Sequence, residues 1–294
     1  MLSQCVESVR RHTRDYELIL VDNASTDNSL VLTSPGPDLR VFKLSSNIGF
    51  AGANNVGIKE SSGRYVVLLN SDTVVTRNWL DALVGQAEKD ASIGLVAPKL
   101  LRPGNPTLLD SAGHSCRYET AVCKDRGHGE PDKGQYDHLT ELPSCCFACA
   151  LIKKQVFFHI GLLDKKMFLY FEDVDFSLRA RIAGWRIVYC PESVVYHIRG
   201  GSTRITGQRQ LWSRSRAYLL RIILKNYQTW PMLLYGTRRF LMELIGIAAA
   251  AKNRDRDYAW GCAESIFWNL VHLPARDRVL VQRLRRIPDK AIFT

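Results

Sequence analysis

The triplet Asn70-Ser71-Asp72 stands directly after a run of apolar residues, Tyr65 to Leu69. A carboxylate on the turn that follows a buried strand is held in a fixed position, and it is a hard oxygen ligand suited to Mg²⁺ or Mn²⁺. A metal ion held there can offset the negative charge of a departing diphosphate. An ordinary Asx turn or helix N-cap has the same pattern, so the triplet alone leaves both interpretations open.

A second acidic segment, Glu172-Asp173-Val174-Asp175, follows five aromatic or apolar residues. Apolar surroundings raise the proton affinity of a carboxylate and suit it to general-base catalysis. Acidic residues also favour the first turn of a helix through its dipole, which accounts for Asp173 and Asp175 without any catalysis. The role of His197 is also left open by the sequence, because a single histidine after an apolar strand is more often a hydrogen-bonded core residue than a metal ligand.

These segments need a scaffold, and the apolar pattern predicts an α/β one. Short apolar runs indicate strands at 17–21, 40–44, 65–69, 93–97, 185–189 and 194–197, and helices are expected at 3–13, 51–61, 79–89 and 173–183. Such alternation is typical of a largely parallel sheet. Asp22, Asn47 and Asn70-Ser71-Asp72 lie just beyond strand ends, where open α/β sheets bind ligands. We therefore expect three polar turns to face one site.

The charge divides the chain into two parts. Residues 1–203 hold 23 Lys/Arg and 23 Asp/Glu, whereas residues 204–294 hold 17 and 6 and account for the whole net charge of +11. We place a domain boundary near residue 204, with a catalytic domain at 1–204 and a basic helical region at 205–294. Residues 102–141, rich in Gly, Pro, His and charge, form a long excursion of the kind that often shapes a substrate pocket.

The cysteines give a weaker signal. The chain has 8 of them and no signal-peptide pattern follows Met1, so we expect them to be reduced and mostly buried. The segment Cys145 to Cys149 could form half of a zinc site, with partners among Cys116, Cys123, His114 and His128. No second CxxC at a standard spacing supports that site.

Four segments resemble, in order and spacing, the motifs of the family 2 glycosyltransferases: 21–27 (VDNASTD), 47–55 (NIGFAGANN), 68–73 (LLNSDT) and 170–175 (YFEDVD). Segments 126–129 (RGHG) and 134–137 (GQYD) are similar to those of bacterial rhamnosyltransferase-like members. The resemblance covers roughly residues 2–205, and four linked motifs are far more specific than one. It implies a GT-A fold, which is a Rossmann-like α/β sandwich with a mostly parallel sheet.

The resemblance also implies a role for each motif. Asp72 and His197 would hold a Mg²⁺ or Mn²⁺ ion, although Asn70 replaces the first Asp of the usual Asp-x-Asp motif. Asp173 would deprotonate the acceptor, and Glu172 and Trp185 would hold the acceptor sugar. The nucleotide-sugar would be bound by Asp22, Ser25, Asp27, Asn47, Gly49, Asn55, Asn70 and Ser71. The implied reaction is a single displacement that inverts the anomeric configuration.

By the same resemblance, the donor would be a dTDP- or UDP-sugar, with dTDP-rhamnose as the specific expectation. The acceptor would be a glycan or a lipid-linked sugar in cell-envelope polysaccharide synthesis. Family members begin with an apolar strand, whereas this chain opens at Met1 in the helix that follows it. We therefore expect a central strand to be missing from the sheet, with backbone groups left unpaired. Either the start is too far downstream, which the intact motifs favour, or the chain is a degraded copy that binds nucleotide-sugar without turnover.

The basic region interleaves arginines with aromatic and apolar residues, Trp212, Trp230 and Trp268 among them. Its apolar stretch Phe240 to Ala251 contains Glu243 and is too short and too polar to span a bilayer. Such a region fits an anionic membrane surface, which would place the protein in the cytoplasm at the inner face of the cell membrane. The alternative is a basic helical subdomain packed against the catalytic domain.

Two other functional classes fit the sequence less well. The pI of about 9.4 raises nucleic-acid binding, but residues 1–203 are neutral and no helix-turn-helix, RRM or zinc-finger pattern is present. We therefore expect no nucleic-acid partner. A sugar-phosphate nucleotidyltransferase would require an early Gly-rich phosphate loop with a basic residue, which the sequence lacks.

Overall fold

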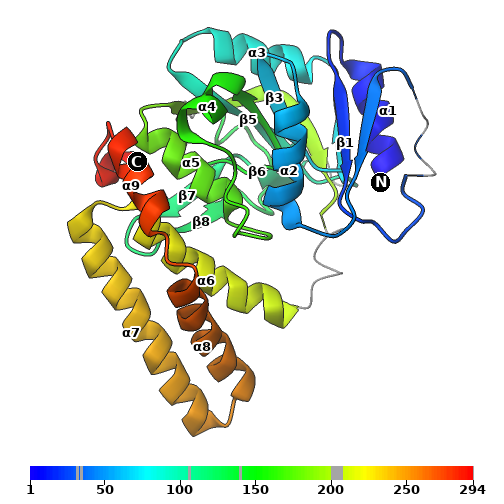
Figure 1. The fold of residues 1–294 in the computed structure, drawn as a ribbon. Helices are drawn as coiled ribbons and strands as arrows, with labels where there is room; N and C mark the ends of the chain where they lie inside the picture. Colours follow the sequence, from blue (N-terminus) through cyan, green and yellow to red (C-terminus); the bar gives the residue numbers. More distant parts are fainter. Residues whose placement is uncertain (31–32, 34–35, 105–106, 139–140, 200–207, 294) are drawn as a thin grey trace.

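The computed structural model describes residues 1–30, 33, 36–104, 107–138, 141–199 and 208–293. Its helices are α1 (Leu2–His12), α2 (Gly49–Glu60), α3 (Trp79–Glu88), α4 (Lys154–Ile160), α5 (Glu172–Ile182), α6 (Gln208–Asn226), α7 (Thr229–Asn253), α8 (Arg256–Val271), α9 (Ala275–Leu284) and α10 (Asp289–Ile292). Its strands are β1 (Leu18–Asp22), β2 (Leu39–Lys43), β3 (Tyr65–Leu69), β4 (Thr73–Val75), β5 (Ile93–Leu101), β6 (Leu109–Ser111), β7 (His114–Arg117), β8 (Val122–Asp125), β9 (Cys149–Lys153) and β10 (Arg186–His197). The expected α/β alternation is confirmed (Figure 1).

The main sheet has the strand order β3-β9-β5-β10-β4, with β6 paired to β5. Among the strands that the structure describes, only β5 and β10 pair in parallel within it, so the prediction of a mostly parallel sheet is wrong. The reason lies in the long excursion after β5, from which β9 returns antiparallel between β3 and β5. The two strands expected at 185–189 and 194–197 are a single strand, β10, with a register shift between Cys190 and Val194.

Helices cover both faces of the main sheet. Val9 of α1 and the buried Trp79, Leu83 and Ala87 of α3 pack in one apolar cluster with one face. The other face packs against α2, α4 and α5 in a second cluster. Helix α3 buries apolar residues at helical spacing on one side, whereas α5 is buried on almost every side because it lies between two apolar clusters. The sheet is therefore a buried layer between two helical layers.

Strands β1 and β2 form a separate parallel pair, in register from Leu18↔Leu39 to Asp22↔Lys43. Among the described residues, no strand lies between β1 and β3, as the sequence leads one to expect. The apolar residues of both strands, Leu18 to Val21 and Tyr65 to Leu69, instead line one cavity of 2090 Å³ together with α1. We call this part of the cavity, between β1 and β3, the slot.

The C-terminal region is helical, as expected, and it joins the main body through α6. The buried face of α6, Ala217 to Ile223, packs on α5, α9 and the β7–β8 hairpin in a third apolar cluster. Helices α7 and α8 extend from there, away from β1 and α1 (Figure 1). The boundary expected near residue 204 lies outside the described residues. In the part of the chain that the structure describes, no helix is long and apolar enough to cross a bilayer.

Candidate active site

The turns after β1 and β2 are tied to each other by asparagine side chains. Asn23 Nδ2 donates to Asn47 Oδ1 over 2.9 Å, and Asn23 Oδ1 accepts from the Ile48 amide over 2.9 Å. Asp22 Oδ1 caps its own turn by accepting from the Ser25 amide over 3.0 Å. We call the loops 22–27 and 47–49 the turn wall of the cleft. Its side chains are mostly exposed, and its shape comes from short-range Asx hydrogen bonds.

Gly49 links the turn wall to the segment that precedes α5. Its φ is +79°, and a Cβ there would lie 2.4 Å from the carbonyl oxygen of Phe168. The neighbouring Phe50 amide donates to that same oxygen over 2.7 Å. Only glycine permits both the left-handed conformation and the close approach. The motif glycine thus has a packing function, whatever it does for a ligand.

Asp72 and His197 meet because β4 pairs antiparallel with β10, in a register that sets Thr73 opposite His197. His197 Nε2 lies 3.5 Å from Asp72 Oδ1, and the Ile198 amide donates to the Asp72 carbonyl. Residues 125 positions apart thus share one end of the sheet. A carboxylate oxygen beside an imidazole nitrogen is a donor set that fits Mg²⁺ or Mn²⁺.

Asp110 on β6 holds the other side of His197. Its Oδ2 accepts from His197 Nδ1 over 2.8 Å, and its Oδ1 accepts from Arg199 Nε over 2.6 Å. Asp110 has no exposed surface. Burial by itself lowers the pKa of His197, but its hydrogen bonds to Asp110 and Asp72 raise that pKa to about 9. A carboxylate on Nδ1 fixes the ring so that Nε2 faces Asp72.

The ion pairs continue into the β7–β8 hairpin. Arg199 also donates to Asp125, over 2.5 Å, and Asp125 Oδ1 lies 3.4 Å from His114 Nε2. His114 and Asp125 are direct partners in the hairpin register. We call the series Asp72, His197, Asp110, Arg199, Asp125 and His114 the ionic wall. Its charges alternate in sign along the whole series when both histidines are protonated.

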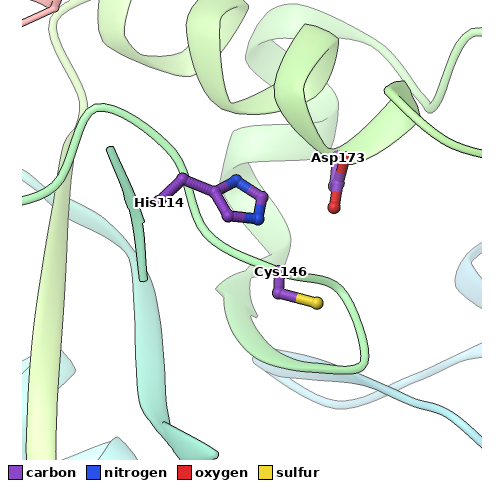
Figure 2. A group of neighbouring side chains, drawn as sticks. All are labelled: His114, Cys146 and Asp173. Atoms are coloured by element: carbon purple, nitrogen blue, oxygen red, sulfur yellow. The ribbon is translucent and has the colours of Figure 1, made fainter. Parts of the chain in front are cut away.

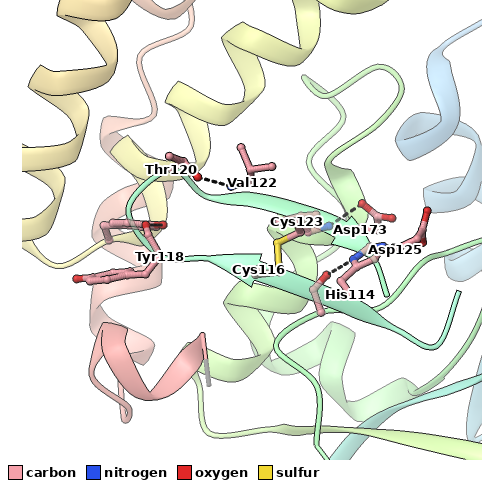
Figure 3. The surroundings of a disulfide bond; sticks show 11 residues. His114, Cys116, Tyr118, Thr120, Val122, Cys123, Asp125 and Asp173 are labelled. Atoms are coloured by element: carbon pink, nitrogen blue, oxygen red, sulfur yellow. Dashed lines mark hydrogen bonds and ion pairs between the residues drawn. A yellow bond between two sulfur atoms is a disulfide. The ribbon is translucent and has the colours of Figure 1, made fainter. Parts of the chain in front are cut away.

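A disulfide joins Cys116 and Cys123 inside the same hairpin (Figure 3). The expectation that the cysteines are all reduced is therefore wrong for this pair, because opposite positions of a two-stranded hairpin bring their sulfur atoms within bonding distance. The other six cysteines are free, and five of them are buried, as expected.

Asp173 lies in the first turn of α5, close to His114 of the ionic wall. It is the second residue of α5, after two consecutive residues with positive φ, Tyr170 at +70° and Phe171 at +66°. Left-handed backbone at two bulky residues is strained, and such strain gathers at functional sites. Burial raises the pKa of Asp173, while the His114 charge lowers it. Glu172 is buried without a hydrogen-bond partner for Oε2 among the described residues, and burial raises its pKa well above the usual range.

Figure 2 shows that His114, Cys146 and Asp173 point toward a shared space. One ligand atom from each lies within 4.8 Å of the others. Of the zinc partners suggested by sequence, only His114 joins a cysteine of the 145–149 segment in this group. Burial raises the pKa of the Cys146 thiol well above its ordinary value, which disfavours the thiolate that zinc requires. His114 and Asp173 are thus close enough for the charge of one to act on the other.

Most of the predicted site residues line the one cavity. They are Asp22, Ser25, Asp27, Asn47, Gly49, Asn70, Ser71, Asp72, Glu172, Asp173 and His197. Two predicted residues do not, and their placement is a correction. Asn55 faces the other way and exchanges two hydrogen bonds with the backbone of Leu163. Trp185 precedes β10 at the end of the sheet opposite His197, where its Nε1 donates to His159.

Sequence reasoning missed Asp110, Arg199, Asp125 and His114 as a connected set. Asp110, His114 and Asp125 all lie in the excursion 102–141, which was expected to shape a pocket but offered no residue pattern to rank them. Their common feature is the pairing of opposite charges across distant segments, which only the folded chain displays.

A family model described as "Glycosyl transferase family 2" matches residues 1–161. The chain belongs to glycosyltransferase family 2. Its similarity to Glycosyltransferase GlyG of Streptococcus pneumoniae is 36% identity over 222 residues, or 72% of this chain and 71% of that protein. This chain is 26% identical over 219 residues to the N-acetylglucosaminyl-diphospho-decaprenol L-rhamnosyltransferase of Mycobacterium tuberculosis. That match covers 65% of this chain and 69% of the mycobacterial protein.

The family 2 chain is also 28% identical over 236 residues to the O-antigen biosynthesis protein RfbC of Myxococcus xanthus. That match covers 74% of this chain but only 18% of RfbC, so RfbC is a much longer protein.

Two solved structures share the fold. GalNAc-T7 with UDP, GalNAc and Mn²⁺ has a TM-score of 0.64 at 18% identity and covers 91% of this chain and 54% of its own. The structure of S. aureus TarS residues 1–349 with UDP-GlcNAc has a TM-score of 0.59 at 14% identity. That match covers 96% of this chain and 86% of the TarS chain. The expected GT-A fold is confirmed.

Proposed function

We propose that this family 2 chain is a metal-dependent inverting glycosyltransferase that moves rhamnose from dTDP-rhamnose to a lipid-linked or glycan acceptor of the cell envelope. The observation that carries the proposal is the convergence of Asp72, His197 and Asp173 on one cavity. Similarity to the mycobacterial rhamnosyltransferase supports the choice of sugar and of a lipid-linked acceptor. We place the reaction in the cytoplasm, at the inner face of the cell membrane.

The turn wall is the proposed seat of the nucleotide. Asp22 would accept hydrogen bonds from the donor's base or ribose, and the Asn23–Asn47 pair holds the two loops at a fixed separation. Asn70 and Ser71 lie between the turn wall and Asp72, where the diphosphate would reach. Asp22 and Asp27 on this wall are both acidic, so a bound diphosphate needs a cation to be stable there.

Asp72 Oδ1 and His197 Nε2 would hold that divalent cation once the cation has displaced the Nε2 proton beside Asp72, and the cation would supply positive charge to the leaving diphosphate. Asp110 keeps the imidazole oriented, because His197 donates to it through Nδ1. Arg199 Nε donates to the second oxygen of Asp110, so that both oxygens of the buried carboxylate have a partner.

Asp173 is the proposed catalytic base. Its carboxylate takes the proton of an acceptor hydroxyl while that oxygen attacks the anomeric carbon, and the bond from that carbon to the diphosphate oxygen breaks. One displacement gives the inverted product, nucleoside diphosphate and a protonated Asp173. The pKa of Asp173 is raised by burial, which strengthens it as a base, and the charge of His114 opposes that rise.

The test measures binding and transfer separately. Calorimetry with dTDP and UDP, each with Mn²⁺ and with EDTA, should show binding that requires the metal. Transfer should then be followed with dTDP-rhamnose and, for comparison, UDP-N-acetylglucosamine, using a polyprenyl-diphosphate-linked sugar as acceptor. Metal-independent binding would contradict the proposed site. Metal-dependent binding without transfer, for any donor tried, would favour the alternative of a nucleotide-sugar binder that lacks turnover.

A further inference from the structure

Large apolar side chains are exposed mainly in one part of the molecule. Fifteen of the twenty exposed large apolar residues among the described ones lie between Trp230 and Leu280. Scattered single exposures are normal, but a contiguous apolar patch on a folded chain marks a surface that binds something. The concentration on α7, α8 and α9 is therefore a feature to explain.

Helix α7 carries the most continuous part of this surface. Its outward side bears Trp230, Leu233, Leu234, Leu241 and Ile245, which line a shallow groove. We call these five residues the α7 outer face. Trp230 is 81% exposed, Leu234 63% and Ile245 66%. Their spacing of three, four and seven residues places them along one stripe, opposite the side that packs on α6 and α8.

The charges of α7 are sorted between its two sides. Its only acid, Glu243, is fully buried and paired with Arg216 of α6 and with Arg239. The exposed charged side chains of α7 are Arg238 and Lys252, both basic. The outer face is thus apolar with a basic border and no acid of α7 exposed.

This charge pattern decides between the candidate occupants. A second copy of the chain would bring basic residues of α7 together with no exposed acid of α7 to pair with them. An anionic lipid bilayer supplies both the apolar interior for the leucines and the negative headgroups for Arg238 and Lys252. The exposed Trp230 at the start of α7 suits the boundary between headgroups and acyl chains.

We propose that the α7 outer face docks onto an anionic lipid bilayer, with the helix axis lying along the surface. Apolar side chains enter the acyl region and the bordering cations contact phosphate groups. The inference deepens the proposed function, because it names the surface that would bring the cleft to a lipid-linked acceptor. It rests on the exposure and charge of α7, and it holds whether or not the cleft transfers a sugar.

The experiment is co-sedimentation of the whole chain with vesicles. Vesicles of phosphatidylcholine and phosphatidylglycerol should bind it, and vesicles of phosphatidylcholine alone should bind it at least about tenfold more weakly. Leu234→Glu and Ile245→Glu should each lower the affinity about tenfold or more. Each substitution removes an apolar side chain that would be buried in the bilayer, and each adds a negative charge that the anionic headgroups repel. Arg238→Gln should lower it about fivefold, the effect of one basic residue near an anionic surface.

Phe158→Glu is the matched control, because Phe158 is 80% exposed on α4 of the main body and should not affect vesicle binding. Circular dichroism checks that the variants fold. Asp173→Asn should sediment like the parent, so that failure of catalysis and failure of docking are told apart. Equal binding of the parent and Leu234→Glu, or a dimer in ultracentrifugation that Leu234→Glu dissociates, would overturn the proposal in favour of another occupant.

Discussion

The two walls of the cleft are built by different means. The turn wall consists of exposed loops after β1 and β2, shaped by Asx hydrogen bonds such as Asn23 to Asn47. The ionic wall is a series of alternating charges, buried at Asp110, His197 and His114 and exposed at Arg199, that joins Asp72 to residues of the β7–β8 hairpin. The first lies beside the slot, whereas the second is held by β4, β6 and β10 of the main sheet and by the β7–β8 hairpin.

This difference has an energetic consequence. Removing a buried member of the series, such as Asp110 or His197, leaves an uncompensated charge and is costly, whereas an exposed turn tolerates the loss of a side chain. Changes to the ionic wall should therefore alter metal binding and stability together. Changes to the turn wall should alter nucleotide affinity with little effect on the fold.

The largest expected effect is at the junction of the ionic wall with α5. Asp173→Asn keeps the shape of the side chain but cannot accept the acceptor's proton, so kcat should fall by about 10²–10⁴. The affinity for dTDP, measured by calorimetry with Mn²⁺, should stay within about threefold of the parent. A variant with undiminished turnover would remove Asp173 from the role of base.

The slot beside the turn wall offers a gain of stability. A five-residue apolar strand fused before α1 through a short turn should pair with β1 and β3 and bury their apolar linings, Leu18 to Val21 and Tyr65 to Leu69. The free energy of unfolding should rise by on the order of several kcal/mol, measured by denaturant titration. A Gly/Ser segment of equal length is the control, and equal stability of the two chains would contradict a strand-shaped slot.

Asp110 should matter for the metal although we do not place it among the ligands. Asp110→Asn weakens the hold on the His197 ring, so Mn²⁺ affinity should fall about 10–100-fold. Calorimetry gives the affinity, and pulsed EPR of bound Mn²⁺ shows whether an imidazole nitrogen still contacts it. His128→Ala is the comparison, because exposed His128 contacts Asp110 from the other side. An unchanged Mn²⁺ affinity in Asp110→Asn would show that the ionic wall does not support metal binding through Asp110.

On the turn wall, Asp22→Ala should weaken dTDP binding about tenfold, the scale of one hydrogen bond to a charged group. Mn²⁺ affinity and the melting temperature should hardly change, because Asp22 caps only an exposed turn. If this substitution unfolded the chain or abolished metal binding, the two walls would be one structural unit.

The smallest effect concerns pH. Burial raises the pKa of Asp173, so activity should be present above that pKa and be lost as the pH falls through it. Protonated His114 lowers that pKa, and His114→Asn should therefore move the acidic limb of the kcat profile to higher pH. A limb that stays in place, or moves to lower pH, would separate His114 from the base.

The sequence predicted many of the residues that line the cavity. Its motifs stand at strand ends and helix starts, which short-range sequence patterns can locate. Asp22, Asn70-Ser71-Asp72 and Asp173 all line the cavity as expected. Asn55 and Trp185 were misplaced because position in a motif, or an aromatic side chain, does not reveal which end of an element faces the cleft. The direction of β9 was also hidden, since a buried apolar run reads the same in parallel and antiparallel sheets.

By itself, then, the sequence determined the local elements, the family and the acidic residues that face the cleft, since these follow from short-range pattern and composition. Tertiary structure alone decided which distant charges meet. Asp110 lies 87 residues from His197, and the β4–β10 register sets Asp72 beside that same ring. It also decided that apolar residues of α7 remain outside while Glu243 turns inward. Burial and long-range pairing are properties of the packed chain, because they depend on which surfaces the other elements cover.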